Sequence, residues 1–227
     1  QALSYLGQAF YYGHGVPKNY QQARLYFERA YDHGSFGGLT LLAEMYEHGL
    51  GGPASPDEAA YLYQQDYTRN KDASALSALK QLSTNGSLYA RLVLSDLSTK
   101  DQTERHADRV VLAKDGLLAA QCRVGIDFSM GLGTIPDHAA AIFWLEKAKA
   151  RGSLCAVRHI ATLNEQGIGM AKDLNHAASL HEEAIAMAER PRFGDVERPE
   201  KHIIDSKAAL KRLTQKQANI TAEVLPD

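Results

Sequence analysis

Apolar residues recur along this chain at helical spacing, and pairs of glycines interrupt them at regular points. In the stretch ALSYLGQAFYYG, Leu3, Leu6 and Phe10 follow one another at intervals of three and four residues, which is typical of one face of an α-helix. Three later stretches, GLTLLAEMYEHG, AQCRVGIDFSMG and AVRHIATLNEQG, carry apolar residues at similar spacing. Each stretch therefore predicts a short helix that ends at a glycine.

A Gly-x-Gly doublet closes each of these helices and defines a repeat. The step between the first two doublets, and between the last two, is 36 residues. An alanine stands eight residues after each second glycine, and glycine or alanine stands six residues before each first glycine. Columns in register of this kind indicate repeated units. The doublets are Gly13 with Gly15, Gly49 with Gly51, Gly131 with Gly133, and Gly167 with Gly169.

A second helix is expected after each doublet. Ser55 precedes Pro56, and an acidic residue follows within the first turn, which is a typical helix start. The small residue of the first helix lets the second helix approach closely, and Gly34 and Gly152 end two of the second helices as left-handed caps. Between the second and third doublets the pattern is less regular, and three helices are expected within 71–116.

The segments YLGQAFYYGHGVPKNYQQARLYFERAYDHG and AAIFWLEKAKARG resemble the Sel-one-like repeat (SLR) family, which is related to the tetratricopeptide repeats (TPR). Its pattern runs A-x-x-x-L-G-x-x-Y-x-x-G-x-G-V, a short acidic loop, then A-x-x-W-Y-x-K-A-A-x-x-G. The resemblance covers residues 2–70 and 117–189. It implies an all-α fold, a right-handed α-solenoid of stacked antiparallel helix pairs forming an SLR/TPR-like superhelix.

This resemblance leads to an expected division of the chain. We expect a superhelix of about six repeats over 1–189, in which 71–116 is degenerate. The segment ERPRFGDVERPEK carries two prolines and alternating charges, so 190–199 is expected to be a loop. A helix over 200–220 is expected to cap the last repeat, because solenoids need capped ends for solubility. A docking helix for a partner is the alternative for this last segment.

Composition excludes some partners and leaves the compartment open. The 227 residues carry a net charge of −2 without a basic patch, so nucleic acid is not an expected partner, and no apolar run approaches the ~18 residues of a membrane span. Two cysteines, Cys122 and Cys155, are too few for a disulfide framework. We expect free, buried thiols, with one bridge between neighbouring helices as the alternative. The chain begins at Gln1 already inside an apolar pattern, so a signal peptide or upstream repeats could precede it and its location stays open. A periplasmic or secreted location is slightly favoured over a cytoplasmic one.

Motifs of catalysis and of metal or phosphate binding do not occur. The doublets lack the third glycine and the preceding strand of a dinucleotide loop, and none of the nine histidines falls in a metal-binding spacing. Cys122 or Cys155 beside His159 is interpreted as a packed thiol rather than a nucleophile pair. No cofactor, no metal and no catalytic residue is expected. A hydrolase remains the rival hypothesis, and Glu44, Glu47 and His48 would then supply its polar cluster.

The concave face of a helical repeat array is the expected binding surface, because first helices line it. The tetratricopeptide register, transferred through the Leu6-Gly7 match, assigns positions to this groove. The partner-binding candidates are Gln8, Tyr11 and Tyr12 in the first repeat, Glu44, Glu47 and His48 in the second, Ile126 and Met130 in the fifth, and Arg158 and Glu165 in the sixth.

Two features of this surface have alternative interpretations. Ile126 and Met130 are interpreted first as core packing and second as a partner-binding stripe. All 11 tyrosines lie at or before Tyr89, and they either pack structurally or form a recognition region that includes Tyr11 and Tyr12.

The resemblance implies a non-enzymatic scaffold that binds another protein. Bacterial proteins of this kind serve in signalling, envelope assembly and host interaction, and as immunity proteins that neutralise secreted antibacterial effectors. We favour an immunity or regulatory role. An envelope-assembly or signalling adaptor is the first alternative, and a glycan- or peptidoglycan-binding protein, or a peptidoglycan-acting enzyme, is the second.

Overall fold

The computed structural model describes residues 1–188 and 205–215. Regular secondary structure in this part of the chain is entirely helical, as the sequence predicts. A helical segment over 205–215 follows the named helices. The named helices are α1 (Ala2–Tyr12), α2 (Tyr20–Asp32), α3 (Leu39–His48), α4 (Pro56–Asn70), α5 (Ala73–Thr84), α6 (Leu88–Leu97), α7 (Gln102–Lys114), α8 (Leu118–Met130), α9 (His138–Lys149), α10 (Leu154–Gln166) and α11 (Leu174–Ala188).

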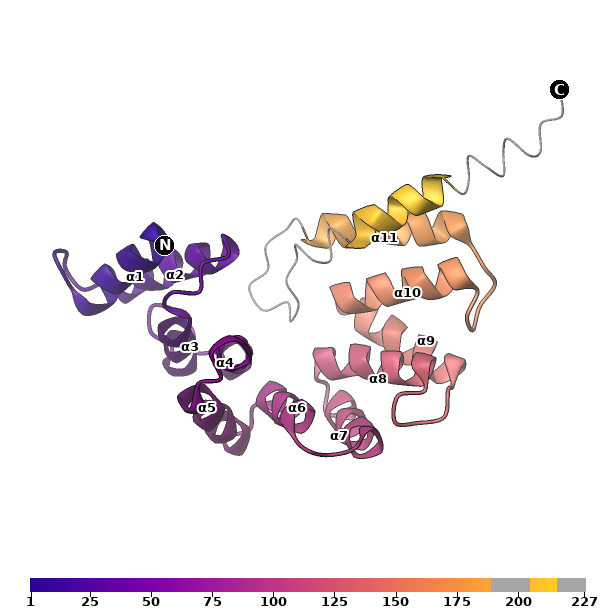
Figure 1. Ribbon diagram of the computed structural model, residues 1–227, viewed down its shortest axis with the longest axis horizontal. Helices are drawn as coiled ribbons and strands as arrows, with labels where there is room; N and C mark the ends of the chain where they lie inside the picture. The colour runs from indigo at the N-terminus through magenta and orange to yellow at the C-terminus, as the bar shows by residue number, and fades with distance from the viewer. Residues whose placement is uncertain (189–204, 216–227) are drawn as a thin grey trace, which may run out of the picture. The chain divides into compact units, whose positions relative to one another are not determined.

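The helices group into two compact units, Gln1–Ser98 and Thr99–Asp227. In the first unit α1 packs against α2, α3 packs against α4, and α5 and α6 both pack against α4. In the second unit α7 packs against α8, α8 against α9, and α10 against α9 and α11 (Figure 1). The helix pairs that the doublets predict are therefore present, and the predicted fold class is confirmed.

The glycine doublets are hinges, as predicted. The first glycine of each doublet is the left-handed C-cap of a first helix, with φ between 68° at Gly49 and 80° at Gly13. A left-handed backbone conformation of this kind favours glycine, because glycine has no Cβ that would clash with the backbone. Ser55 stands at the N-cap of α4 with Pro56 at the first helical position, but its side chain makes no capping hydrogen bond.

Small residues let the two helices of a pair approach closely. A Cβ built on Gly7 would lie 2.7 Å from the Phe27 ring, and one built on Gly125 would lie 2.6 Å from Leu145 Cγ. Neither distance is possible between real atoms without a shift of the neighbour. The column of small residues therefore sets how tightly the helices of these pairs meet.

The expectation of free thiols is wrong: Cys122 and Cys155 form a disulfide with a Cα–Cα distance of 6.3 Å. The bridge joins α8 to α10, the first helices of consecutive pairs, so the alternative of a bridge between neighbouring helices is the correct one. The two cysteines are 33 residues apart, which is one repeat of 36 less about one helical turn. This spacing brings them side by side on adjacent helices.

Three helices, α5, α6 and α7, occupy the segment 71–116, as predicted. The boundary between the two units falls between α6 and α7. The predicted loop over 190–199 lies outside the described residues. Of the predicted helix over 200–220, the structure describes 205–215, which is helical.

Candidate protein-interaction face

The candidates of the first unit lie on α1 and α3. Gln8, Tyr11, Glu44 and Glu47 are partly buried, and Tyr12 keeps 52% of its surface exposed. The aromatic rings form a cluster, because the Tyr11 ring contacts the rings of both Tyr12 and Tyr20 edge-on at centroid distances of 4.9 and 5.4 Å. His48 is exposed at the end of α3.

Tyr11 and Glu44 face each other across α1 and α3. Burial raises the pKa of the Tyr11 hydroxyl, and the negative charge of Glu44 raises this pKa further. The hydroxyl therefore stays protonated, and it can donate a hydrogen bond to a carboxylate. The two helices thus bring together residues that are 33 positions apart in the sequence.

Glu47 has a partner that the sequence analysis did not assign to the site. The buried Tyr63 of α4 donates its hydroxyl hydrogen to Glu47 Oε2 at 3.0 Å. Burial and the charge of Glu47 raise the pKa of Tyr63 far above its ordinary value. Tyr63 occupies the column of Phe27, which is a core position, and only its hydroxyl distinguishes it from a packing residue. We name Tyr11, Tyr12, Glu44, Glu47 and Tyr63 the tyrosine–glutamate face.

The candidates of the second unit are placed differently. Ile126 packs against the buried cluster of the α8–α11 core, whereas Met130 at the end of α8 is 64% exposed. Arg158 Nη2 pairs with Asp205 Oδ2 at 2.9 Å, and Glu165 Oε2 lies 3.9 Å from Arg212 Nη2. These two residues of α10 therefore contact the segment 205–215.

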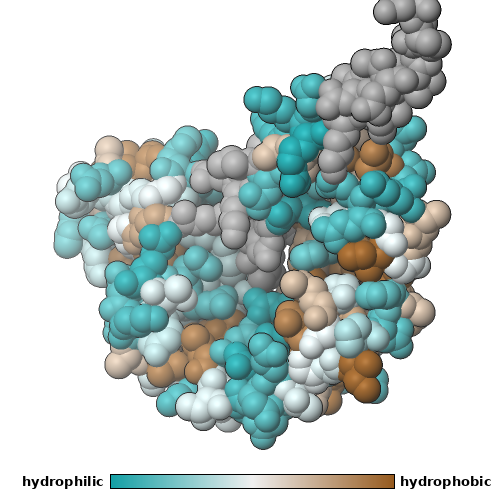
Figure 2. All heavy atoms as spheres, turned by 45° about the vertical axis from the view of Figure 1, so that its right-hand side comes forward, coloured by the Kyte–Doolittle hydropathy of each residue, from teal (hydrophilic) through white to brown (hydrophobic). Residues whose placement is uncertain are grey.

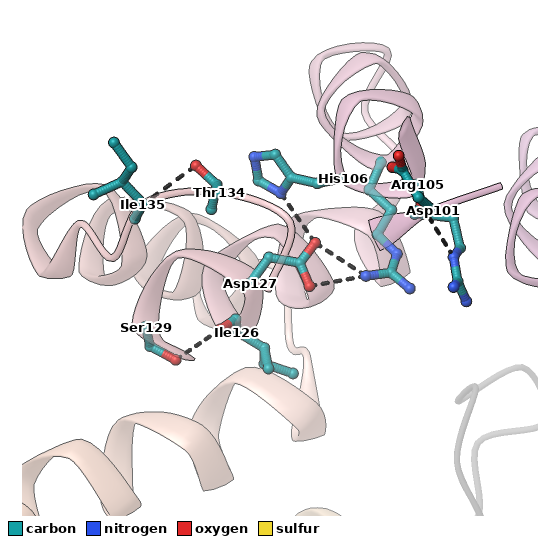
Figure 3. A network of polar contacts seen from close by, with 9 residues as sticks. Asp101, Arg105, His106, Ile126, Asp127, Ser129, Thr134 and Ile135 are labelled. Atoms are coloured by element: carbon teal, nitrogen blue, oxygen red, sulfur yellow. Dashed lines mark hydrogen bonds and ion pairs between the residues drawn. The ribbon is translucent and has the colours of Figure 1, made fainter. Parts of the chain in front are cut away.

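A buried polar network links α7 to α8 (Figure 3). Asp127 is 1% exposed; Arg109 Nη1 donates to both of its carboxylate oxygens at 2.8 and 3.0 Å, and His106 Nδ1 lies 3.1 Å from Oδ2. The His106 ring meets Phe128 edge-on. Because both oxygens of Asp127 already have partners, the network is suited to holding the helices together.

Two other features, a metal-binding cluster and a membrane-spanning helix, do not occur in the described ranges. Within residues 1–188 and 205–215, no group of three or more His, Cys, Asp or Glu side chains could hold a metal ion. No helix in the same ranges is long and apolar enough to cross a bilayer. On the surface seen in Figure 2, hydrophobic side chains are scattered among hydrophilic ones. Exposed apolar residues of the second unit include Met130, Ile135 and Phe143.

Paired helices, glycine hinges and small-residue columns define a helical repeat protein. The chain belongs to the Sel1 repeat family, because the Sel1 repeat model matches more than half of it, and such repeats generally act as protein-interaction scaffolds. The suspected resemblance is thereby confirmed. The model matches residues 1–35, 38–65, 118–153 and 157–188.

One solved structure supports the same fold, and a second shows a weaker likeness. A protective antigen present in uropathogenic Escherichia coli strains, described as displaying an SLR fold, is 20% identical with a TM-score of 0.50 and covers 99% of this chain and 56% of its own. A Sel1 repeat protein from Oxalobacter formigenes is 22% identical with a TM-score of 0.44 and covers 82% of this chain and 51% of its own. This chain thus spans about half the length of these proteins. No curated protein matches it.

Proposed function

We propose that this chain is a non-catalytic scaffold whose tyrosine–glutamate face binds a protein partner. The observation that supports this is the grouping of Tyr11, Tyr12, Glu44 and Glu47 on the first helices of two consecutive repeats, where they stay at least partly accessible. Tyrosine supplies a large contact area at low conformational cost. Carboxylates beside it add polar specificity.

The finer proposal is an immunity or regulatory protein that neutralises a secreted antibacterial effector. The disulfide between Cys122 and Cys155 supports a periplasmic or secreted location, because disulfides persist in oxidising compartments. An envelope-assembly or signalling adaptor would work in the same compartment. A glycan-binding role is the second candidate, because Tyr5 and Tyr12 are 70% and 52% exposed and exposed aromatic rings stack on sugars.

The test co-produces this chain in the bacterial periplasm with each secreted protein encoded beside its gene. We expect one such protein to be toxic alone, to be neutralised by the chain, and to co-elute with it in gel filtration. Tyr11→Ala with Tyr12→Ala should abolish both effects, whereas Phe143→Ala, which removes an exposed ring from α9, should not. Neutralisation that survives the double substitution would contradict the proposed face. Binding to a glycan array, with no protein partner, would favour the second candidate.

A further inference from the structure

Among the described residues, the two carboxylates of the tyrosine–glutamate face form no ion pair. Glu44 and Glu47 are three residues apart on α3 and are partly buried. Within the described part of the chain, Glu47 accepts from the Tyr63 hydroxyl, and the neighbours of Glu44 are the tyrosines Tyr11 and Tyr63. None of the ion pairs of the described residues includes either glutamate.

This arrangement is unfavourable for the isolated chain. Like charges three or four residues apart on a helix repel each other, and partial burial removes water that would otherwise stabilise both charges. Hydrogen bonds from tyrosine hydroxyls relieve this cost only in part, because they bring no positive charge. A cation supplied from outside would remove the repulsion.

The same unit contains a completed version of this arrangement. The Tyr46 hydroxyl donates to Glu28 Oε1 at 2.7 Å, and Arg24 Nε donates to the same oxygen at 3.0 Å. The Arg24 guanidinium also lies 3.7 Å from the centroid of the Tyr46 ring. At Glu28 the chain therefore supplies its own guanidinium, which pairs with the carboxylate and stacks on the tyrosine.

The tyrosine–glutamate face has the carboxylates and the aromatic rings of that arrangement, but no guanidinium of residues 1–188 and 205–215 pairs with these carboxylates. Tyr63 occupies only one carboxylate oxygen of Glu47. The Tyr11 ring lies near Glu44 and contacts the Tyr12 ring, and the neighbouring Tyr20 ring already has the Lys18 ammonium 4.6 Å from its centroid. The aromatic cluster is thus able to accept a cation on a ring face.

We infer that Glu44 and Glu47, with the rings of Tyr11 and Tyr12, bind an arginine side chain in a basic segment of the partner protein. This inference rests on the proposed function and names the chemistry of the partner. Guanidinium fits better than ammonium, because its planar fork donates to a carboxylate through two N–H groups while its plane stacks on a ring. The partner segment is therefore expected to be basic and rich in arginine.

The test measures the fluorescence anisotropy of two labelled peptides with the whole chain. One is a short glycine–serine peptide that carries arginine; the other has the neutral isostere citrulline in place of each arginine. We expect the arginine peptide to bind at least about tenfold more tightly and to perturb the NMR ring signals of Tyr11. Glu44→Gln with Glu47→Gln should lower its affinity to that of the citrulline peptide.

Two controls separate this site from general attraction and from misfolding. Glu182→Gln removes an exposed carboxylate from α11 and should leave the affinity unchanged. The Glu44→Gln and Glu47→Gln double variant should melt at the same temperature as the wild type or higher, since a repulsion is removed. Equal binding of the two peptides, or full affinity of the double variant, would overturn the inference.

The outcomes for the partner itself distinguish this inference from the proposed function. A partner that still binds the double glutamine variant, but not the Tyr11→Ala and Tyr12→Ala variant, would overturn the arginine inference and leave the scaffold function standing. A partner whose binding is insensitive to both pairs of substitutions would overturn the proposed face, and the inference with it.

Discussion

The helix pairs α1–α4 and α8–α11 share one geometry but are held together by different chemistry. Both regions keep small residues where paired helices meet and left-handed glycines at the hinges. Between the helices, α1–α4 use aromatic rings and tyrosine–glutamate hydrogen bonds, as at Tyr46 and Tyr63. The α8–α11 region instead buries an aliphatic core and closes it with a disulfide.

This difference shows that the repeat period constrains only a few positions. Positions where two helix backbones approach closely must hold glycine or alanine. The residues around these positions need only fill the space between the helices. In the first region these less constrained positions hold carboxylates and hydroxyls that stay partly accessible. In the second region they hold aliphatic residues and a disulfide, which stabilise the fold. A binding face is therefore expected in the first region, and the most destabilising substitutions are expected in the second.

The largest effect is expected at Asp127, where the second region departs most from the common pattern. The equivalent positions are Ala9, Met45 and Leu163, which are apolar. Asp127→Leu would leave Arg109 and His106 facing an apolar side chain, and removing one partner of a buried ion pair costs about 3–5 kcal/mol. Chemical denaturation of the variant should show this loss in the free energy of unfolding.

A compensating variant tests the cause of this loss. Asp127→Leu combined with Arg109→Met and His106→Leu replaces the charge network by an apolar interface between α7 and α8, and most of the lost stability should return. If the triple variant were as unstable as Asp127→Leu alone, the charge network would not be the reason for the loss.

The disulfide is expected to give the next largest effect, and only in the second region. It closes a loop of 33 residues, for which the loss of chain entropy corresponds to about 3–4 kcal/mol. Replacing Cys122 and Cys155 by alanine should lower the melting temperature of the unfolding step that involves α8–α11. Reductant should do the same to the wild type and nothing to the variant. An unchanged melting profile would show that packing alone holds α8 to α10.

Sequence alone predicted the helix pairs, the hinges and the family, because each depends on a residue type at a fixed period. Gly13 and Gly49 have positive φ, which favours glycine, and this preference is visible in one sequence. Relations between helices were predicted less well. The Cys122–Cys155 bridge needs two helices to be adjacent, and the spacing near one repeat was its only signal.

The candidate site was predictable in part, because some of its residues occupy fixed positions in the repeat. Tyr11 and Glu44 were found from the repeat register, and the structure brings them together. Tyr63 was missed because it lies on a second helix in a core column, where only its hydroxyl points to Glu47. The contact of Arg158 with Asp205 links residues 47 positions apart, and no periodic pattern connects them.

A smaller effect is expected where the two regions are alike. Gly7 in α1 packs under Phe27, as Gly125 in α8 packs under Leu145. Gly7→Leu should therefore destabilise by about 1–3 kcal/mol through overpacking, measured by denaturant unfolding. Gly34→Ala is a control without overpacking, because nothing lies within 4 Å of a Cβ added at Gly34. This control reports only the backbone strain that an alanine has at the φ of 73° of Gly34. A stable Gly7→Leu variant would show that the pair can open at this position.

The smallest effect is expected at His181, which takes the place of Phe27, Tyr63 and Leu145 in the last pair. It is 5% exposed, and neither ring nitrogen has a hydrogen-bond partner in the described ranges. Burial lowers its pKa; Glu165 opposes this shift, while Arg158 and Arg212 add to it. His181→Leu should raise stability by about 1–2 kcal/mol, because it removes buried polar groups without partners.

The pH dependence of the same variant gives the sharper measurement. Because the folded pKa of His181 lies below its unfolded value of about 6.5, the unfolded chain takes up a proton first as the pH falls. Stability should therefore decline as the pH drops below about 6.5 in the wild type, and less steeply in His181→Leu. Parallel stability curves for the two proteins between neutral and mildly acidic pH would show that His181 gains a partner when it is charged, and the last pair would then resemble the polar first region more than the aliphatic second.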